Sequence, residues 1–301
     1  GLTCLIACKQ KKEKEMASAD FKAPSFYIEQ TDTEIKVFAD GGSAVVVTQN
    51  TLPDFRPYIH PILAPGTAVE LTQFSPGHHK HQTGLYWGFT RVNGTGASAD
   101  ELKKWFYDLE KPKEIQKKIG LDFFHNPDGD HWQKVSSEVL VAKGKEVQWK
   151  TVYTMLDRDK NPILKETQTW TFTQKDNKYF LSLEWQGEAL TDFTVNEFDY
   201  GGLFLRMPWE KGIKGEVVNA ARQRNEKANG QRAMWADAGM EIDGLEEWGH
   251  IAILDHTGNT GYPQPWRVDG QLGMGPVLAK LGDWQIKKGE TKIFKHQIVA
   301  Y

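Results

Sequence analysis

The stretch Tyr27–Asp40, YIEQTDTEIKVFAD, decides the fold class together with Ser43–Asn50, SAVVVTQN, which follows it. In both segments apolar and polar residues alternate or β-branched residues run together, as in β-strands, and short turns of Thr, Asp and Gly separate the strands. Similar segments follow at 137–143, 147–156, 166–174, 178–187, 250–256 and 291–301. This succession of short strands and turns predicts an all-β, antiparallel sandwich.

One segment replaces the strand pattern with a helical one. The sequence SADE at 98–101 is a capping box, and apolar residues recur at the spacing of one helix face over 102–109. Pro112 ends this helix, and a second short helix can follow it. We therefore expect a single β-sandwich domain over 26–301 with a helical insertion at about 98–120.

The composition is that of a soluble globular protein. Of the 301 residues, 26% are charged and 39% are hydrophobic, and the net charge of -3 offers no positive field to a phosphate backbone. Nucleic acid is therefore not expected as a partner. The eleven tryptophans suit both a sandwich core and the apolar faces of sugars.

Residues 1–25 read as a lipoprotein signal remnant and a charged tether. Both cysteines of the chain, Cys4 and Cys8, lie here, and LIAC at 5–8 matches a lipobox in which Cys8 carries the lipid. No later segment approaches the roughly 20 apolar residues of a membrane span. We expect an exported bacterial lipoprotein of the periplasm or outer membrane that contacts the membrane only through this anchor. The alternative is a cytosolic N-terminus.

Three of the nine histidines lie in Ser75–Gly84, SPGHHKHQTG. If this segment is extended, His79 and His81 point to the same face and His78 points to the other. Two imidazoles on one face can begin a metal site, can supply a general acid or base, or can lie in an exposed polar loop. The pattern assigns no cofactor, although a divalent metal is compatible with it.

A second polar group precedes the histidines. In DFRPYIHP at 54–61, Arg56, Tyr58 and His60 occupy alternate positions between stiffening prolines, so they share one face of an extended segment. A guanidinium, a phenol and an imidazole on one face form a surface for anions and hydroxyl groups. The alternative is a surface ion pair between Arg56 and Asp54.

An ordered series of motifs resembles the bacterial PmoA-like family of secreted or periplasmic proteins. The motifs are RPYIHPILAPG at 56–66, the histidine stretch with GLYWG at 84–88, GGLFLRMP at 201–208, MWADAG at 234–239 and HIAILDHTGNTGYPQPWRV at 250–268. The resemblance covers roughly residues 26–301. It implies carbohydrate processing, because members of the family commonly occur in polysaccharide-degrading bacteria.

The chain departs from this family in the histidine motif, which in the family reads Asp-His-x-His-His-Arg-Gly. His79 and His81 are kept, whereas His78, Gln82 and Thr83 stand at the other polar positions. A role that needs the second adjacent histidine or the arginine is therefore not carried over. The closing segment 287–301, KKGETKIFKHQIVAY, resembles the last strand of galactose-mutarotase-like proteins, which favours a large supersandwich-like fold of two sheets over a jelly roll.

The motifs are rich in histidine and arginine, whereas glycoside hydrolysis usually needs two carboxylates. Histidine can remove a proton next to a carboxylate that a guanidinium neutralises, so we predict a lyase or dehydratase acting on anionic, uronic-acid-containing oligosaccharides. The predicted acid and base residues are His60, His79, His81, His256 and Tyr58, the anion-binding residues are Arg56, Arg206 and Arg267, and the ring-stacking residues are Trp87, Trp235 and Trp266.

Two other functions stay open. A surface lipoprotein that binds glycans without chemistry needs the tryptophans but not the histidines. A metal-dependent glycan hydrolase or epimerase needs further ligands, which Asp255 and His256 could supply together with His79 and His81.

Overall fold

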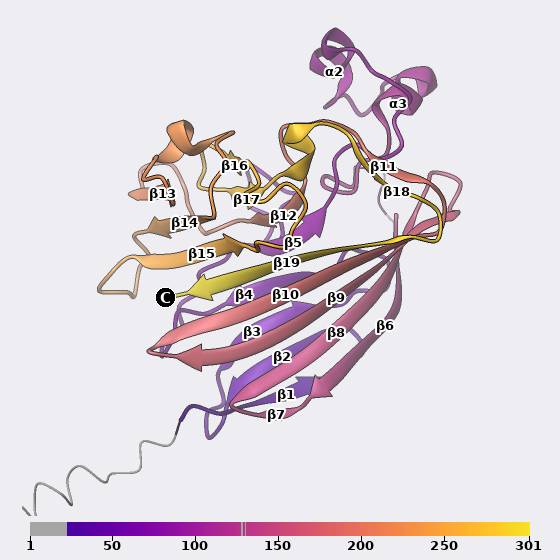
Figure 1. Cartoon of the computed structure of the whole chain (residues 1–301). Helices are drawn as coiled ribbons and strands as arrows, with labels where there is room; N and C mark the ends of the chain where they lie inside the picture. Colours follow the sequence, from indigo (N-terminus) through magenta and orange to yellow (C-terminus); the bar gives the residue numbers. More distant parts are fainter. Residues whose placement is uncertain (1–22, 128, 130) are drawn as a thin grey trace, which may run out of the picture.

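One layer of the structure is a nine-stranded antiparallel sheet, which lies behind the other layer in Figure 1. The computed structural model describes residues 23–127, 129 and 131–301. In spatial order the strands are β16 (Trp266–Val268), β17 (Met274–Pro276), β12 (Gly202–Leu205), β5 (Leu85–Gly88), β4 (Tyr58–Ile62), β3 (Val45–Asn50), β2 (Glu34–Ala39), β1 (Phe26–Gln30) and β7 (Lys143–Gly144). The stretch Tyr27–Asp40 forms the β1–β2 hairpin, in which Ile35 and Val37 are fully buried.

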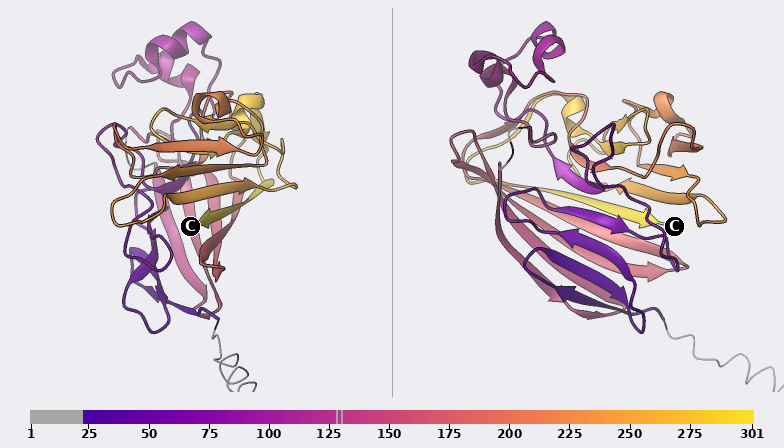
Figure 2. Two further views of the ribbon diagram at one scale, coloured as in Figure 1. Left: turned by 90° about the vertical axis from the view of Figure 1, so that its left-hand side faces the viewer. Right: turned by 180° about the vertical axis from the view of Figure 1, so that it is seen from behind.

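The second layer is an eight-stranded antiparallel sheet. Its strands in spatial order are β13 (Gly215–Asn219), β14 (Trp235–Met240), β15 (Gly249–Asp255), β19 (Thr291–Ala300), β10 (Lys178–Ala189), β9 (Pro162–Lys175), β8 (Glu146–Leu156) and β6 (Trp132–Val141). A separate pair is formed by β11 (Phe193–Val195) and β18 (Trp284–Ile286). Figure 2 shows the two layers from behind and from the side. The structure confirms the predicted all-β, antiparallel two-sheet sandwich.

Aromatic side chains dominate the core between the sheets. Alternate residues of β8, β9 and β10 face inward, and Trp149, Trp170 and Trp185 are at most 2% exposed. Trp87 of β5 stacks on Trp185 with ring centroids 4.8 Å apart, which joins the two sheets. Burying one such side chain removes about 150–250 Å² from water and contributes on the order of 4–6 kcal/mol.

A carboxyl group also lies in this core. Glu166 on β9 is 1% exposed and accepts hydrogen bonds from Nε2 of Gln168 (2.9 Å) and Nε1 of Trp185 (2.8 Å). Burial raises the pKa of Glu166 to about 7, although the two hydrogen bonds act in the opposite direction. The folded chain therefore holds this proton more tightly than the unfolded chain does.

We expect Glu166→Gln to change how stability depends on pH. The pKa of Glu166 is raised from 4.5 to about 7 on folding, so its stabilising contribution is complete below about pH 4.5 and is lost as pH rises through 7. The shift corresponds to about 3 kcal/mol. The free energy of unfolding of the variant, measured in urea relative to that of wild type, should increase by roughly this much between about pH 4.5 and pH 8. Glu184→Gln, at a partly exposed position on β10, is the control. If the difference in the free energy of unfolding between wild type and Glu166→Gln does not vary with pH, the expectation is wrong.

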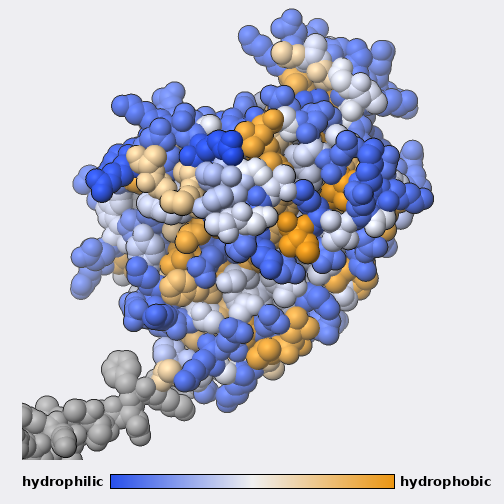
Figure 3. Space-filling view, viewed as in Figure 1, coloured by the Kyte–Doolittle hydropathy of each residue, from blue (hydrophilic) through white to orange (hydrophobic). Residues whose placement is uncertain are grey.

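Two α-helices, α2 (Ala99–Trp105) and α3 (Lys113–Ile119), project from one end of the sandwich in the described part of the chain (Figures 1 and 2). They lie within the predicted helical insertion, and the predicted capping box is confirmed: the Ser98 hydroxyl accepts from Glu101 N (3.1 Å), and the Glu101 carboxylate accepts from Ser98 N (2.8 Å). The surface of the insertion is mostly hydrophilic (Figure 3). Two short 3-10 helices, η1 (Asn225–Ala228) and η2 (Leu278–Leu281), complete the regular elements.

The predicted lipobox, with the lipid on Cys8, lies outside the described residues, and so does most of the predicted tether. Within residues 23–127, 129 and 131–301, no helix has the length and apolar character needed to cross a membrane.

Candidate functional site

A cavity of about 320 Å³, called here the central cavity, lies between the histidine loop (75–83), the turn at 122–125, strands β12 and β16, and the helical insertion. Its lining consists of His78, His79, His81, Gln82, Tyr107, Phe124, His125, Tyr200, Phe204, Arg267 and Asp269. The fold thus brings His79, His81 and Arg267, which the sequence predicts as site residues, to one place.

Backbone hydrogen bonds shape the histidine loop. Ser75 N donates to Gln82 O (2.7 Å), and Gln82 N donates to His79 O (3.0 Å). The loop is therefore built of turns, whereas the expectation that His79 and His81 share a face assumed an extended segment. The two rings still lie near each other, with centroids 5.7 Å apart.

Arg56 lies beneath the histidine loop and is 1% exposed. Its guanidinium donates hydrogen bonds to the carbonyl oxygens of His81 and Phe124 and lies over the ring of Tyr86, 3.9 Å from the centroid. Arg56 thus ties the loop to the turn at 122–125. This placement differs from the predicted role in substrate binding, because the guanidinium is buried and its donors serve the backbone.

Arg206, directly after β12, supports the loop from a second direction. Its fully buried guanidinium donates to the side chains of Gln82 and Asp269 and to Gln271 O. Burial raises the pKa of Asp269, but the charge of Arg206 and two backbone N–H groups outweigh burial and hold the pKa below its ordinary value. Arg206 thus lies outside the lining of the central cavity, and its buried donors hold Gln82 of the loop and Asp269 in place.

Four imidazoles follow one another along the central cavity. Nδ1 of His78 lies 2.7 Å from Nδ1 of His79, and the ring centroids of His81 and His125 are 4.3 Å apart. Burial, followed by repulsion from His125 and Arg56, lowers the pKa of His81 to about 2, so this ring is neutral at physiological pH. Its Nε2 atom is buried without a hydrogen-bond partner in the described part of the chain. A ligand in the cavity can supply that partner.

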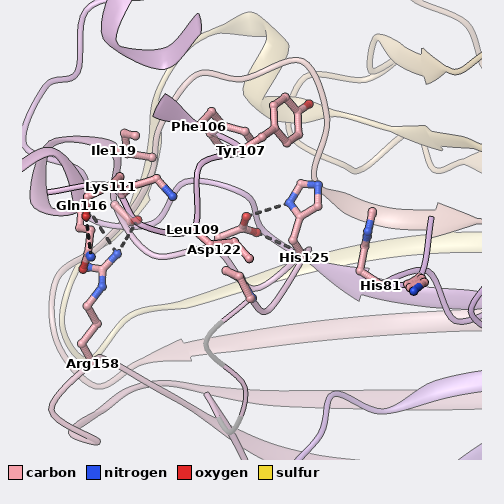
Figure 4. A pocket seen from close by; sticks show the side chains of 13 residues that line it. His81, Phe106, Tyr107, Leu109, Lys111, Gln116, Ile119, Asp122, His125 and Arg158 are labelled. Atoms are coloured by element: carbon pink, nitrogen blue, oxygen red, sulfur yellow. Dashed lines mark hydrogen bonds and ion pairs between the residues drawn. The ribbon is translucent and has the colours of Figure 1, made fainter. Parts of the chain in front are cut away.

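His125 belongs to a chain of hydrogen bonds. Its Nδ1 lies 2.8 Å from Oδ2 of Asp122 (Figure 4), and its Nε2 lies 3.3 Å from the hydroxyl of Tyr200. We assign the proton to Nδ1, because the carboxylate can only accept, and this leaves a lone pair on Nε2. The hydroxyl of Tyr200 lies 2.6 Å from that of Tyr107. Burial, followed by the contact with Tyr107, raises the pKa of Tyr200 and keeps its phenol protonated.

This row of hydrogen-bonded groups has the parts needed for acid–base chemistry. The imidazole of His125 can accept a proton at Nε2, and the carboxylate of Asp122 then stabilises the imidazolium. The phenol of Tyr107, at the opposite end, can donate a proton. Donor and acceptor groups are therefore held in one row before any ligand binds.

Arg267 on β16 provides a cation for this cavity. Its guanidinium lies over the ring of Tyr200, 5.4 Å from the centroid, and the side chain is partly exposed. Unlike Arg206, which pairs with Asp269, it has no ion-pair partner among residues 23–127, 129 and 131–301. A planar guanidinium in this state is suited to a carboxylate ligand.

Figure 4 shows residues that line a second hollow. This hollow has a volume of about 280 Å³ and shares His81, Tyr107 and His125 with the central cavity. The helical insertion supplies much of its wall, including Phe106 and Leu109. At its far end Arg158 donates to the carbonyl oxygen of Gly120 (3.1 Å). The two hollows therefore adjoin at the imidazole pair and Tyr107.

Two of the predicted catalytic residues lie on β4, outside the lining of the central cavity. The rings of Tyr58 and His60 both pack near Phe74, at 5.5 Å and 6.1 Å between centroids. Nδ1 of His60 lies 2.9 Å from the hydroxyl of Thr72. Burial raises the pKa of Tyr58, which does not favour its predicted use as an acid.

The remaining predicted residues are dispersed. His256 is exposed after β15 and lines a separate hollow of about 500 Å³ on the eight-stranded sheet. Trp87 and Trp266 are buried in the core, where Nε1 of Trp266 donates to Ala233 O (2.8 Å). Trp235 on β14 is half-buried and is not part of the central cavity. The predicted stacking on sugar rings is therefore not open to the two buried indoles in this structure.

The residues considered for a metal site do not converge. In the described part of the chain, no group of three or more His, Cys, Asp or Glu side chains is arranged to hold an ion. Asp255 and His256 line a different hollow from His79 and His81. The carboxylate of Asp255 accepts hydrogen bonds from Asn259 (2.7 Å) instead.

Four residues of the hydrogen-bonded row, Asp122, His125, Tyr200 and Tyr107, are absent from the sequence prediction. One local signal exists for the first two: Asp122 accepts from the backbone N–H of His125 (2.9 Å), an Asx turn in which an aspartate three residues before a histidine orients its ring. No local signal connects Tyr107 with Tyr200, which lie 93 residues apart in the chain.

Comparison with known families gives one match. The model described as "Family of unknown function (DUF6807)" matches residues 41–301. Among curated proteins no relative matches.

Several solved structures show a distant likeness. A galactose mutarotase-related enzyme from Lactobacillus acidophilus has a TM-score of 0.34 and 8% identity, with 92% of this chain and 97% of that chain covered. A galactose mutarotase-like protein from Lactobacillus casei has a TM-score of 0.37 and 9% identity, with 92% and 100% covered. A GH36 α-galactosidase from Geobacillus stearothermophilus has a TM-score of 0.37 and 9% identity, with 91% and 41% covered. With TM-scores of 0.34 to 0.37, these structures show neither the fold nor the activity of this chain.

Proposed function

We propose that this chain, which belongs to the DUF6807 family of unknown function, is a carbohydrate lyase or dehydratase that acts on uronic-acid-containing oligosaccharides. One observation carries the proposal: Asp122-oriented His125, neutral His81 and unpaired Arg267 meet in a single cavity of about 320 Å³. This volume lies in the range of small-ligand sites. The resemblance of the sequence motifs to the PmoA-like family implies carbohydrate processing and is compatible with the proposal.

The chemistry begins with the carboxylate of a uronic acid on Arg267. The guanidinium neutralises this group and stabilises the enolate-like charge that forms when the neighbouring C–H bond breaks. Nε2 of His125 takes the proton, and Asp122 stabilises the imidazolium. His81, neutral and with a free Nε2, is placed to hydrogen-bond the developing oxyanion.

Elimination completes the reaction. The electron pair of the broken C–H bond forms a carbon–carbon double bond, and the bond from the next carbon to its oxygen breaks. That oxygen receives a proton from Tyr107, whose hydroxyl lies 2.6 Å from that of Tyr200. If the leaving oxygen belongs to a glycosidic bond, the oligosaccharide is cleaved. If it belongs to a hydroxyl group, water is lost.

Hydrolysis by two carboxylic acids fits the cavity less well. Asp269 is paired with Arg206, and Asp122 is paired with His125. Neither carboxylate is available as a nucleophile or as a proton donor to a glycosidic oxygen, which paired-acid hydrolysis requires. The geometry therefore favours elimination.

The activity is tested with purified protein and a set of uronate oligosaccharides. We expect ultraviolet absorbance to rise as a conjugated double bond forms, and His81→Asn to lower kcat by about a hundredfold, the usual loss for one group that stabilises an oxyanion. His250→Asn is the matched control, because His250 lies on β15 and pairs with Asp237 outside the central cavity. No unsaturated product from any uronate oligosaccharide would exclude the lyase, and binding without turnover would identify a glycan-binding protein instead.

A further inference from the structure

A broad trough of about 930 Å³ adjoins the central cavity. Tyr107, Tyr200 and Arg267 line both spaces, so the two adjoin at these three residues. One wall of the trough comes from the helical insertion, including Leu102 and Lys103 of α2. The other wall comes from the segments around 197–200, 230–232 and 265–281.

The charge of the trough is opposite in sign to that of the whole chain. Its lining contains five cationic side chains, Arg91, Lys103, Arg232, Arg267 and Lys280, and two acidic ones, Glu197 and Asp199. The net charge of the chain is -3. A basic hollow in an acidic protein concentrates anions, because charge on the walls of a cleft acts in a medium of lower dielectric constant.

Three of the five cations serve the fold. Arg91 donates to the carbonyl oxygens of Ile119 (3.2 Å) and Glu197 (2.8 Å), and Arg232 donates to that of Pro263 (2.8 Å). Nζ of Lys280 pairs with the carboxylate of Asp199 at 2.9 Å; the contacts of these three cations are thus already made.

Lys103 and Arg267 are different. Lys103 is exposed on α2, and within the described ranges neither residue has an ion-pair partner. They belong to opposite walls, with Arg267 at the junction with the central cavity. Two available cations in one trough can bind two carboxylates of an extended ligand.

Apolar surface accompanies these cations. Leu102 and Leu281 line the trough, and the rings of Phe106 and Phe198 stack there with centroids 4.3 Å apart. The C–H faces of sugar rings pack on such surfaces while their hydroxyls and carboxylates contact the polar rim. Cationic and apolar groups together fit an acidic sugar better than an acidic peptide or a neutral glycan.

We infer that the trough binds the next units of an anionic oligosaccharide whose reacting uronate occupies the central cavity. The inference rests on the proposed function, and it adds that the helical insertion selects substrate by length and charge. A ligand longer than one sugar extends past Tyr107 and Arg267 and places a further carboxylate near Lys103. Affinity should therefore increase with chain length for polyuronates.

Binding is measured separately from turnover by isothermal titration calorimetry in a His125→Asn background. The probes are galacturonic acid, its dimer, trimer and tetramer, and neutral maltotetraose. We expect the tetramer to bind at least about tenfold more tightly than the monomer, and Lys103→Glu to remove most of this gain while leaving monomer affinity within about twofold. Lys104→Glu is the matched control, because Lys104 is the next residue of the same helix, carries the same charge and is not part of the trough.

The outcomes separate the two proposals. Equal effects of Lys103→Glu and Lys104→Glu, affinity that does not increase with length, or maltotetraose binding as tight as that of the uronate tetramer would each overturn the inference. If wild type forms no unsaturated product but affinity still increases with uronate length and depends on Lys103, the lyase reaction is wrong and the binding trough stands. If the wild type forms unsaturated product but its affinity does not increase with uronate length, the lyase proposal stands and the binding role of the trough is wrong.

Discussion

His125→Ala is expected to lower kcat on uronate oligosaccharides by about a thousandfold, within the range for loss of a general base. The variant removes Nε2, the atom that accepts the proton, and no other group at the His125 position replaces it. The turn itself should persist, because Oδ1 of Asp122 still accepts from the backbone N–H groups of Phe124 (3.0 Å) and residue 125 (2.9 Å). Initial rates of product absorbance and a thermal melt of the same samples provide the measurement.

Asp122→Asn distinguishes orientation from simple loss of structure. An amide at position 122 can still accept a hydrogen bond but no longer stabilises an imidazolium by charge, so kcat should fall by about ten- to a hundredfold with little change in KM. Activity of His125→Ala within about threefold of wild type, at an unchanged melting temperature, would show that His125 is not the base.

Arg206→Met should destabilise the fold by about 3–5 kcal/mol, which is the usual cost of removing one partner from a buried ion pair. Asp269 then keeps a buried carboxylate without its cation, and the side-chain oxygen of Gln82 loses its donor. Because burial of Asp269 is no longer opposed by the charge of Arg206, its pKa rises. Urea denaturation of wild type and variant at neutral pH measures the change.

A double variant shows whether the ion pair is the cause. Arg206→Met with Asp269→Asn removes the unpaired charge and should recover part of the lost stability. Arg224→Met is the surface control: its guanidinium pairs with Glu216 at an exposed position, so the unfolding midpoint should hardly change. Equal losses for the buried and exposed arginines would contradict the positioning role of Arg206.

The sandwich and its helical insertion are predictable because their signals are local. The β1–β2 hairpin follows from alternation within Tyr27–Asp40, where Ile35 and Val37 enter the core as the period of a strand requires. The capping box of α2 needs only Ser98 and Glu101, which are the two ends of a four-residue segment within one turn. Neighbours along the chain decide both elements.

The candidate site is only partly predictable. His79 and His81 stand out by their spacing, and Arg267 by its motif, and all three line the central cavity. Arg56 and Arg206 have the same chemistry in the sequence as Arg267, yet their guanidiniums are buried and hydrogen-bonded to the fold. A guanidinium that supports a loop and one that can bind an anion differ only in their burial and in their hydrogen-bond partners.

By itself, the sequence determined the β architecture, the capped insertion and a supply of imidazole and guanidinium groups, because periodicity, turns and side-chain chemistry are properties of short segments. Only the tertiary structure decided which groups meet. The row from Asp122 to Tyr107 forms because the turn at 122–125, the insertion and the segment at Tyr200 fold against one another, and such contacts depend on packing between segments far apart in the chain.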